Sequence, residues 1–202
     1  IPTSSPWKKN ISFWELYKNA HTPWDWHRRI FREARQLGME IFSSPFDETA
    51  VDFLEKLNCP AYKIASPEIN HLPLIKKVAQ TGKPIILSTG LAEMKEIELA
   101  VKTIRKCKNK KIIILKCTTS YPSELFELNL KSMNTLKKRF GVLVGFSDHS
   151  IGATAAMTAV ANGAKIIEKH ITLKNKKTVD DFFSLDAEKF KNFVKNLKDV
   201  EL

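Results

Sequence analysis

Short apolar runs alternate with amphipathic segments along most of this chain, and that alternation limits the folds it can adopt. Several runs are nearly continuous stretches of isoleucine, leucine or valine, as expected for parallel strands covered on both faces. The predicted strands are residues 39–43, 61–65, 84–88, 112–117, 142–146 and 165–170. Six strands separated by helices predict an α/β fold, either a barrel or an open doubly wound sheet.

The segments between the strands have the spacing and the end residues of helices. Thr22 and Pro23 begin one helix that Gly38 ends, and Asp47 begins another that runs to about residue 57. Further helices are predicted at 71–80, 93–106, 129–139 and 151–161, and a last one begins near Asp186. We therefore predict one domain over residues 1–202, with 1–22 as a loop and lead-in and 23–202 as strand–helix units.

Composition excludes several classes of protein. With 43% hydrophobic residues in 202, the chain is long enough for a sizeable core. No run approaches the ~20 apolar residues of a membrane helix, and residues 1–10 lack the pattern of a signal peptide, so a soluble cytoplasmic protein is expected. Cys59, Cys107 and Cys117 lack metal-type spacing, which argues against a zinc knuckle or a disulfide framework.

The formal net charge of +11 comes from 33 basic and 22 acidic side chains. Most of the basic residues are lysines scattered over predicted helices, which is typical of solvated helix faces. A nucleic-acid partner is not expected, because no basic stripe interleaved with aromatic residues is present.

Polar side chains gather where the predicted strands end. The strand ends carry Ser43 and Ser44, then Lys63 to Glu68, Ser88 to Gly90, Lys116 to Tyr121, Ser147 to Ser150 and Glu168 to His170. The carboxyl ends of parallel strands meet at one edge, where functional residues of α/β folds gather. Hydroxyl-rich turns can also be simple helix caps. Six such ends in register nevertheless predict a site for a phosphate or carboxylate ligand.

Two histidines, His149 and His170, end consecutive predicted strands. Neighbouring strands lie only ~5 Å apart, so one divalent ion could bridge the two imidazoles and keep open positions for water or substrate. The alternative is a pair of histidines that only make hydrogen bonds in a polar barrel mouth. Asp148 is either an outer partner of this pair or a cap for the helix that follows.

Lys63 and Lys116 lie within apolar strands, where an ammonium needs an anion or a carboxylate beside it. Lys63 is expected to face an anionic ligand, with Glu68 close after it as another possible partner. For Lys116 a structural ion pair is an equal possibility. A different hypothesis is Schiff-base chemistry on a ketoacid, with Lys63 or Lys169 as the nucleophile and no dependence on metal.

The ordered motifs resemble the N-acetylneuraminate synthase family. They run from Phe42-Ser43-Ser44-Pro45-Phe46-Asp47 through Tyr62-Lys63-Ile64-Ala65-Ser66-Pro67-Glu68, Leu87-Ser88-Thr89-Gly90, Cys117-Thr118-Thr119-Ser120-Tyr121-Pro122 and Phe146-Ser147-Asp148-His149 to Glu168-Lys169-His170. Residues 21–27 and 179–185 resemble the pseudaminic acid synthase branch. Thr119 stands where neuraminate synthases have asparagine, which argues against neuraminate itself as the product.

The resemblance implies a (β/α)8 TIM barrel, of which about six strand–helix units, strands 3 to 8, are expected here. It also implies that the first two strands and a C-terminal antifreeze-like domain are absent from this chain. The full-length protein is then expected to be a domain-swapped homodimer.

The activity implied is condensation of phosphoenolpyruvate with 2,4-diacetamido-2,4,6-trideoxy-L-altrose. C–O cleavage with metal assistance would give pseudaminic acid and phosphate. The alternatives are an N-acetylneuraminate or legionaminate synthase, a Schiff-base ketoacid aldolase or lyase, and a non-catalytic sugar- or phosphate-binding remnant.

The resemblance also implies roles for individual residues. His149 and His170 would bind Mn²⁺ or Mg²⁺, with Co²⁺ possible. The groups that would hold phosphoenolpyruvate are Ser44, Lys63, Ser66, Ser88 and Ser147. Glu68, Tyr121 and Asp180 would contact the sugar or the reacting centre, and Phe46 and Thr119 would also bind substrate. Glu68, Lys63 and the two histidines are the predicted catalytic residues, with Glu68 as a proton shuttle or water orienter.

Overall fold

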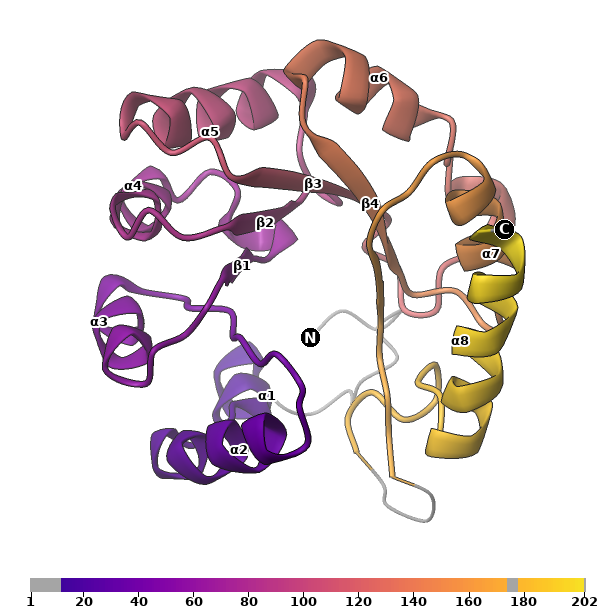
Figure 1. Ribbon diagram of the computed structural model, residues 1–202, viewed down its shortest axis with the longest axis horizontal. Coiled ribbons are helices and arrows are strands. Elements are labelled where there is room, and N and C mark those ends of the chain that lie inside the picture. Colours follow the sequence, from indigo (N-terminus) through magenta and orange to yellow (C-terminus); the bar gives the residue numbers. More distant parts are fainter. Residues whose placement is uncertain (1–11, 174–177, 202) are drawn as a thin grey trace.

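Five parallel strands form the central sheet in a computed structural model that describes residues 12–173 and 178–201. The strands are β1 (Tyr62–Ile64), β2 (Ile85–Ser88), β3 (Ile112–Cys117), β4 (Leu143–Asp148) and β5 (Ile167–Lys169). Their order in the sheet is their order in the chain, so each connection runs through a helix on the outer face. Figure 1 shows the strands as an arc with helices around its convex side, which is the architecture of a partial α/β barrel.

The predicted helices are all present, with ends that differ by a few residues. They are α2 (Trp24–Gln36), α3 (Glu48–Lys56), α4 (Leu72–Gln80), α5 (Met94–Lys106), α6 (Ser132–Phe140), α7 (Thr154–Ala161) and α8 (Ala187–Glu201). Two short 3₁₀ turns, η1 (Ser66–Glu68) and η2 (Leu125–Glu127), lie in the loops after β1 and β3. Asp47 caps α3 by accepting from the Ala50 N–H at 2.9 Å, as its position predicted.

The predicted strand at residues 39–43 is wrong. Ser43 makes a single bridge to Tyr62, in which the Lys63 N–H donates to the Ser43 carbonyl at 3.3 Å. Met39 is 59% and Phe42 40% exposed, while Ile41 packs against the main core. Burial of one side chain does not extend the pairing beyond the bridge, and the segment continues as an irregular chain.

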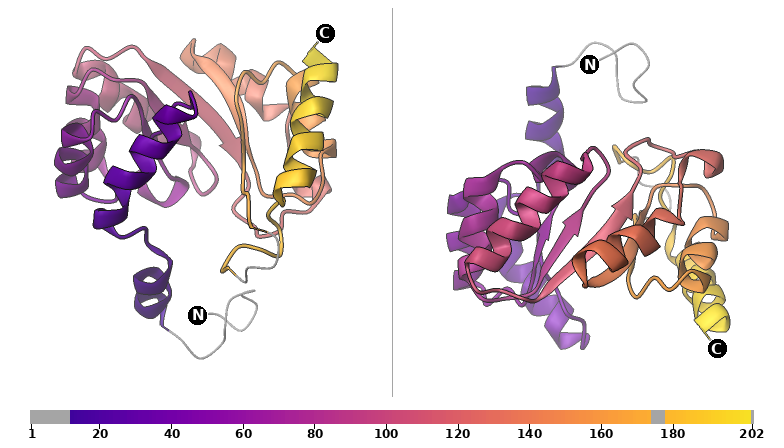
Figure 2. Two further views of the ribbon diagram at one scale, coloured as in Figure 1. Left: turned by 60° about the horizontal axis from the view of Figure 1, so that its bottom comes forward. Right: turned by 90° about the horizontal axis from the view of Figure 1, so that it is seen from above.

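The prediction of a loop over residues 1–22 also needs correction, because α1 (Phe13–Ala20) lies within it. Ser12 accepts from the Glu15 N–H at 3.1 Å, and Glu15 accepts from the Ser12 N–H at 2.8 Å, which is a capping box. Leu16 is the one residue of α1 that is buried. Figure 2 shows α1 projecting from the rest of the molecule in both views.

The strands place alternate side chains on opposite faces of the sheet, and this sets what the site contains. One face packs against the helices and forms the main core. Its strand residues are Tyr62, Ile64, Ile85, Leu87, Ile112, Ile114, Val144 and Phe146. The residues between them, such as Lys63 and Leu115, face the concave side of the arc.

Gly145 faces the concave side, where a side chain would not fit. A Cβ there would lie 2.3 Å from the Ile166 carbonyl oxygen and 2.7 Å from a Leu115 methyl carbon. The absence of a side chain lets Leu115, which is fully buried, fill the floor beneath the strand ends.

In the described part of the chain, no helix combines the length and the apolar character needed to cross a membrane. Cys59, Cys107 and Cys117 are free thiols, and Cys59 and Cys117 are buried.

Candidate functional site

Polar side chains end the strands on the concave face. The alternation that buries the core on one side places these side chains together on the other. They are Lys63 on β1, Ser88 on β2, Cys117 on β3, Ser147 on β4 and Glu168 on β5. Cys117, Ser147 and Glu168 are direct strand partners. His149 and His170 follow two residues after Ser147 and Glu168, so they fall on the same face.

Lys63 and Glu168 form an ion pair across the concave face, with Lys63 Nζ 3.6 Å from Glu168 Oε2. Their strands are the first and last of the sheet, so the pair spans the arc. Ser147 Oγ donates to the other carboxylate oxygen, Oε1, at 2.6 Å. The carboxylate that pairs with Lys63 is thus Glu168 and not the expected Glu68.

Glu168 was not among the predicted site residues. The signal that could have found it is parity: it lies two residues before His170 on the same strand, so both must face one side. Its pairing with Lys63 depends on the curvature of the sheet, which brings β5 opposite β1.

The two histidines lie side by side, with ring centroids 5.3 Å apart and planes at 70°. His149 Nδ1 lies 2.9 Å from the Thr118 carbonyl, which can only accept, so Nδ1 carries the proton. His170 Nδ1 lies 3.4 Å from Asp180 Oδ2. Both Nδ1 atoms therefore face outer partners, an arrangement that presents Nε2 to a metal.

The donor set fits a metal only in part. Residues 12–173 and 178–201 contain no group of three His, Cys, Asp or Glu side chains placed to hold an ion. Two imidazoles could supply two ligands to a divalent ion, and water or substrate oxygens would have to supply the others. That composition suits an exchangeable catalytic ion better than a structural one.

The histidines are packed by aromatic rings. The Tyr121 ring centroid lies 4.2 Å from that of His149, and the Phe183 centroid lies 4.8 Å from that of His170. Burial raises the pKa of Tyr121 above its ordinary value, so its hydroxyl stays protonated and can donate. Phe183 is a neighbour of both imidazoles that the sequence prediction did not single out.

Cys117 lies beneath His149, with Sγ 4.0 Å from Nδ1. Burial alone raises the pKa of this thiol, but the hydrogen bond and charge of His149 outweigh burial and hold it below its ordinary value. Burial in turn lowers the pKa of His149, yet Cys117 and the Thr118 carbonyl raise it above the ordinary value. The two groups stabilise each other's charged forms.

The loops that follow β1, β2 and β3 bring Ser66, Gly90 and Thr119 together. Ser66 Oγ accepts from the Gly90 N–H at 2.9 Å. A Cβ on Gly90 would lie only 2.1 Å from Thr119 Oγ1, so this position needs glycine.

Two polar atoms near the strand ends are buried without a hydrogen-bond partner among the described residues: Ser88 Oγ and Glu68 Oε2. Buried polar atoms are normally satisfied, and such exceptions call for a ligand or another explanation. Burial raises the pKa of Glu68 despite the opposing charges of Lys63 and His71. Glu68 can therefore hold a proton at a higher pH than an exposed carboxylate.

The remaining predicted substrate-binding residues, Ser44 and Phe46, are less buried than the ones that lie on the strands. Ser44 is half-buried and Phe46 is 62% exposed. Both follow Ser43, which bridges in parallel to Tyr62 at the start of β1, so this segment runs alongside β1 toward its carboxyl end.

Three sequence interpretations, for Lys169 on β5, Asp148 on β4 and Lys116 on β3, are corrected by the structure. Lys169 Nζ is buried and lies 2.9 Å from Asp148 Oδ2, on the helix side of the sheet, so Lys169 is not placed as a Schiff-base nucleophile. Asp148 does not cap the next helix, because the N-cap position of α7 is Ala153. Lys116 Nζ donates to the Cys117 carbonyl at 2.6 Å and to Thr118 Oγ1 at 3.1 Å, so it is held by neutral oxygens instead of an ion pair.

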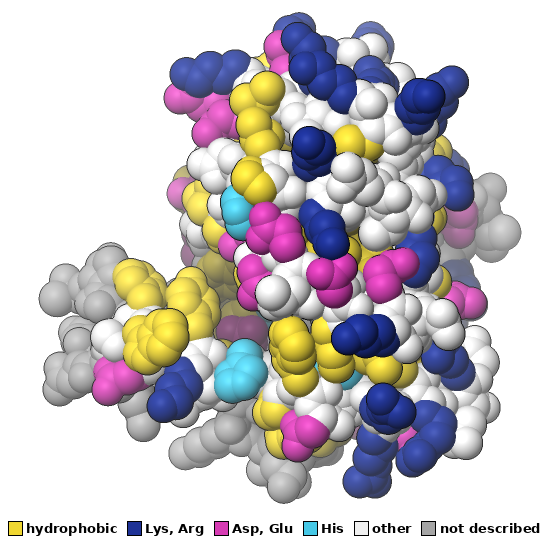
Figure 3. Space-filling model, turned by 90° about the vertical axis from the view of Figure 1, so that its left-hand side faces the viewer, with side chains coloured by type: hydrophobic (Ala, Val, Ile, Leu, Met, Phe, Trp, Pro, Cys, Tyr) yellow, Lys and Arg dark blue, Asp and Glu magenta, His cyan; other side chains and the backbone are white. Residues whose placement is uncertain are grey.

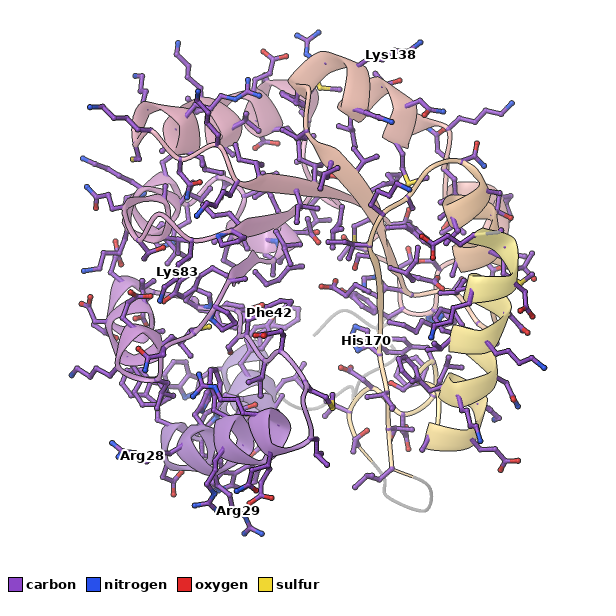
Figure 4. All side chains as sticks on the ribbon, viewed as in Figure 1. Arg28, Arg29, Phe42, Lys83, Lys138 and His170 are labelled. Atoms are coloured by element: carbon purple, nitrogen blue, oxygen red, sulfur yellow. The ribbon has the colours of Figure 1, made fainter. Side chains whose placement is uncertain are left out.

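The basic side chains that dominate the charge lie elsewhere. Figure 4 shows His170 pointing toward the middle of the arc, whereas Arg28, Arg29 and Lys138 point away from it. In Figure 3 the lysines and arginines of the outer face are spread among acidic and neutral side chains.

The fold and the site together define a barrel-type α/β protein whose functional groups lie at the carboxyl ends of its strands, where barrel enzymes have their active sites. The model of the NeuB family matches residues 2–202, and the chain belongs to this family. The resemblance to N-acetylneuraminate synthases predicted from the motifs is confirmed.

The relatives include synthases of several nonulosonic acids. The chain is 47% identical over 193 residues to a pseudaminic acid synthase of Helicobacter pylori, covering 95% of this chain and 56% of that protein. It is 40% identical over 178 residues to an N,N'-diacetyllegionaminic acid synthase of Campylobacter jejuni, covering 87% and 53%. It therefore spans a little over half the length of these relatives.

Among solved structures, the chain is similar to the N-acetylneuraminic acid synthetase from Leptospira borgpetersenii in complex with citrate. The TM-score is 0.88 at 31% identity, and the match covers 93% of this chain and 66% of that one. The barrel-type fold read from the strand order is therefore shared with a solved sialic acid synthetase.

Proposed function

We propose that the protein is a sialic-acid-type synthase that joins phosphoenolpyruvate to an open-chain amino sugar. The observation that carries the proposal is one cluster at the strand ends. It contains a buried lysine, a buried hydroxyl that has no partner in the described part of the chain, and two adjacent imidazoles with Nδ1 facing outer partners. The NeuB family match and the synthase relatives support the same reaction class.

Phosphoenolpyruvate carries a phosphate and a carboxylate, and this cluster offers donors for both. Lys63 supplies a positive charge from within the concave face, where the low local polarity strengthens its attraction for an anion. Ser66, Ser88 and Ser147 add hydroxyls. The Ser88 hydroxyl makes no hydrogen bond within residues 12–173 and 178–201, so it can donate to a ligand. Ser44 would complete the set from the adjacent loop.

The reaction forms a carbon–carbon bond and breaks a carbon–oxygen bond. C3 of phosphoenolpyruvate bonds to the aldehyde carbon of the sugar, water adds at C2, and the C2–O bond breaks so that inorganic phosphate leaves. Mn²⁺ or Mg²⁺, with Co²⁺ as another candidate, would polarise the aldehyde from Nε2 of His149 and His170. Glu68 would take the proton of the attacking water, and burial, which raises the pKa of this carboxyl, favours the protonated form that the transfer produces.

For the sugar, we propose 2,4-diacetamido-2,4,6-trideoxy-L-altrose, which would make the product pseudaminic acid. The support is the 47% identity to a pseudaminic acid synthase, against 40% to a legionaminic acid synthase. Tyr121, Thr119 and Asp180 lie at the rim where the sugar would bind, and Tyr121 also covers His149.

The test is incubation of the full-length protein with phosphoenolpyruvate and, separately, the altrose derivative, the legionaminate precursor and N-acetylmannosamine. We expect phosphate release and a product of pseudaminic acid mass with the altrose derivative alone. ¹⁸O placed in the bridging C2–O bond should leave with the phosphate. Turnover that survives exhaustive chelation would instead support Schiff-base chemistry at Lys63, and ligand binding without turnover would support a non-catalytic remnant.

A domain-swapped homodimer and a cytoplasmic location belong to the same proposal, as properties of the full-length protein. Light scattering on the purified full-length protein would test the first, and fractionation of the source cells the second.

A further inference from the structure

A buried ion pair lies directly behind the two histidines, on the helix side of the sheet. Lys169 Nζ is 2.9 Å from Asp148 Oδ2, and the two side chains are 2% and 0% exposed. The mechanism proposed above uses neither residue, since both face away from the concave site.

The pair is in register with the site. Asp148 on β4 and Lys169 on β5 are direct strand partners, as are Ser147 and Glu168 one residue before them. His149 follows Asp148 and His170 follows Lys169. The ion pair therefore joins the two backbones at the positions adjacent to both imidazoles.

The network also fixes the chain beyond His149. Asp148 Oδ1 accepts from the Ser150 N–H at 2.8 Å and from Ser150 Oγ at 2.6 Å. Lys169 Nζ donates to the Ser150 carbonyl. Residues 148 and 150 are thus both tied to Lys169, with His149 held between them.

Burying two charges is expensive, and well-packed apolar side chains often stabilise a core equally well. The gain from such a pair is a defined geometry. Lys169 Nζ lies 5.8 Å from the centre of the Phe193 ring of α8, so the ammonium is enclosed by protein on its far side as well. The pair has little freedom to move, and the strand ends that it joins share that restriction.

We propose that Asp148 and Lys169 are positioning residues that hold the imidazoles of His149 and His170 at the spacing needed by one divalent ion. The ring centroids are 5.3 Å apart, which suits two nitrogens meeting at a shared ion. This inference rests on the proposed function for its metal, but the geometry that it concerns belongs to the protein alone.

The experiment compares Asp148→Asn and Lys169→Met in the full-length protein with a matched surface pair. The control is Asp52→Asn, which breaks the exposed Lys77–Asp52 pair of 2.6 Å. Calorimetric titration with Mn²⁺ and Co²⁺ should show a dissociation constant raised on the order of 10- to 100-fold in the first two variants and unchanged in the control. Saturating metal should restore much of kcat, which a general loss of structure would not allow.

A second readout needs no metal. Long-range ¹H–¹⁵N spectra of the metal-free protein report the tautomer and surroundings of each imidazole, and we expect the His149 and His170 signals to shift in Asp148→Asn but not in Asp52→Asn. If wild type binds no divalent ion, the metal part of the proposed function fails, and shifted imidazole signals still support positioning. Unchanged imidazole signals with unchanged metal affinity would overturn it. Failure of both variants to fold would overturn it too, because the pair would then be required for the fold itself.

Discussion

Among single residues, Glu68 has a buried carboxylate oxygen that makes no hydrogen bond to any described residue, and burial raises the pKa of this carboxyl. A raised pKa in the folded state means that the carboxylate form costs folding free energy. That cost is absent below the ordinary carboxyl pKa and grows as pH rises through the pKa of the folded state. Glu68 therefore lowers the stability of the fold when it is ionised. Groups with pKa values shifted in this way are common at acid–base catalytic sites.

We expect Glu68→Gln to separate stability from activity. The amide cannot ionise, so the variant should gain stability over wild type near pH 7 and lose that advantage near pH 3. Activity should fall about 10²- to 10⁴-fold, the usual effect of removing a general acid or base. Denaturant titrations at both pH values and steady-state kinetics would measure this. A stability gain that is the same at pH 3 and pH 7 would contradict the role of charge burial.

Gly90 is the residue where the smallest change should have a large effect. In Gly90→Ala the added carbon would meet Thr119 Oγ1 at 2.1 Å and Cys117 Sγ at 2.9 Å, inside the site. We expect a loss of about 1–3 kcal/mol in the free energy of unfolding, typical of overpacking, and a raised KM for phosphoenolpyruvate.

The matched variant for this prediction is the double change Gly90→Ala with Thr119→Ala. Alanine at 119 lacks the hydroxyl that makes the worst contact, so the double variant should recover part of the lost stability. No recovery in thermal melts would show that the hydroxyl is not the obstacle.

Among whole elements, the helices were predicted well because each has local signals at its ends. Asp47 and its bond to the Ala50 N–H are an example, since the capping residue stands directly before the helix. The strand predicted at 39–43 failed for the opposite reason. Apolar content marks a segment that can be buried, but pairing depends on neighbours that the local sequence does not contain.

Helix α1 was missed although its Ser12-Phe13-Trp14-Glu15 start is a capping-box pattern. Its aromatic residues Phe13, Trp14 and Tyr17 are exposed in the structure. A helix that buries so little apolar surface depends more than most on its cap.

We therefore expect Ser12→Ala to loosen α1 without affecting the rest of the molecule. Loss of an N-cap costs about 1 kcal/mol, and in a short projecting helix that cost should appear as local opening. Amide hydrogen exchange should accelerate several-fold within 13–20 and remain unchanged in β1 to β5. Ser12→Thr keeps the capping oxygen and is the control. Equal exchange rates in Ser12→Ala and wild type would mean that other contacts hold the helix.

For the molecule as a whole, the polar residues at the ends of the predicted strands indicated much of the site. Lys63, Ser88 and Ser147 were expected at one rim, and all three lie on the concave face near the carboxyl ends of β1, β2 and β4. The pairing of Lys63 with Glu168 could not be predicted, because it depends on how far the sheet curves between its first and last strands. Curvature is a property of the assembled sheet, and the local sequence around Lys63 or Glu168 does not indicate it.

The Lys63–Glu168 pair allows a last prediction, about whether it serves the stability of the fold or the binding of substrate. Glu168 is 36% exposed and its oxygen lies 3.6 Å from Lys63 Nζ, so solvent screens the attraction. A double-mutant cycle with Lys63→Met and Glu168→Gln should therefore give a coupling of about 1 kcal/mol or less in the free energy of unfolding.

Substrate affinity should respond far more strongly than stability. Losing a charged hydrogen-bond donor to an anion costs about 1.5–3 kcal/mol, so Lys63→Met should raise the KM for phosphoenolpyruvate on the order of 10- to 100-fold. Lys83→Met is the control, because Lys83 forms a 2.5 Å pair with Glu55 away from the site and should leave KM unchanged. If Lys63→Met instead destabilised the fold by several kcal/mol with KM unaltered, the ion pair would be a structural clasp of the arc and phosphoenolpyruvate would have to bind elsewhere. A large KM effect at nearly constant stability would show that the cation is held across the concave face for the ligand.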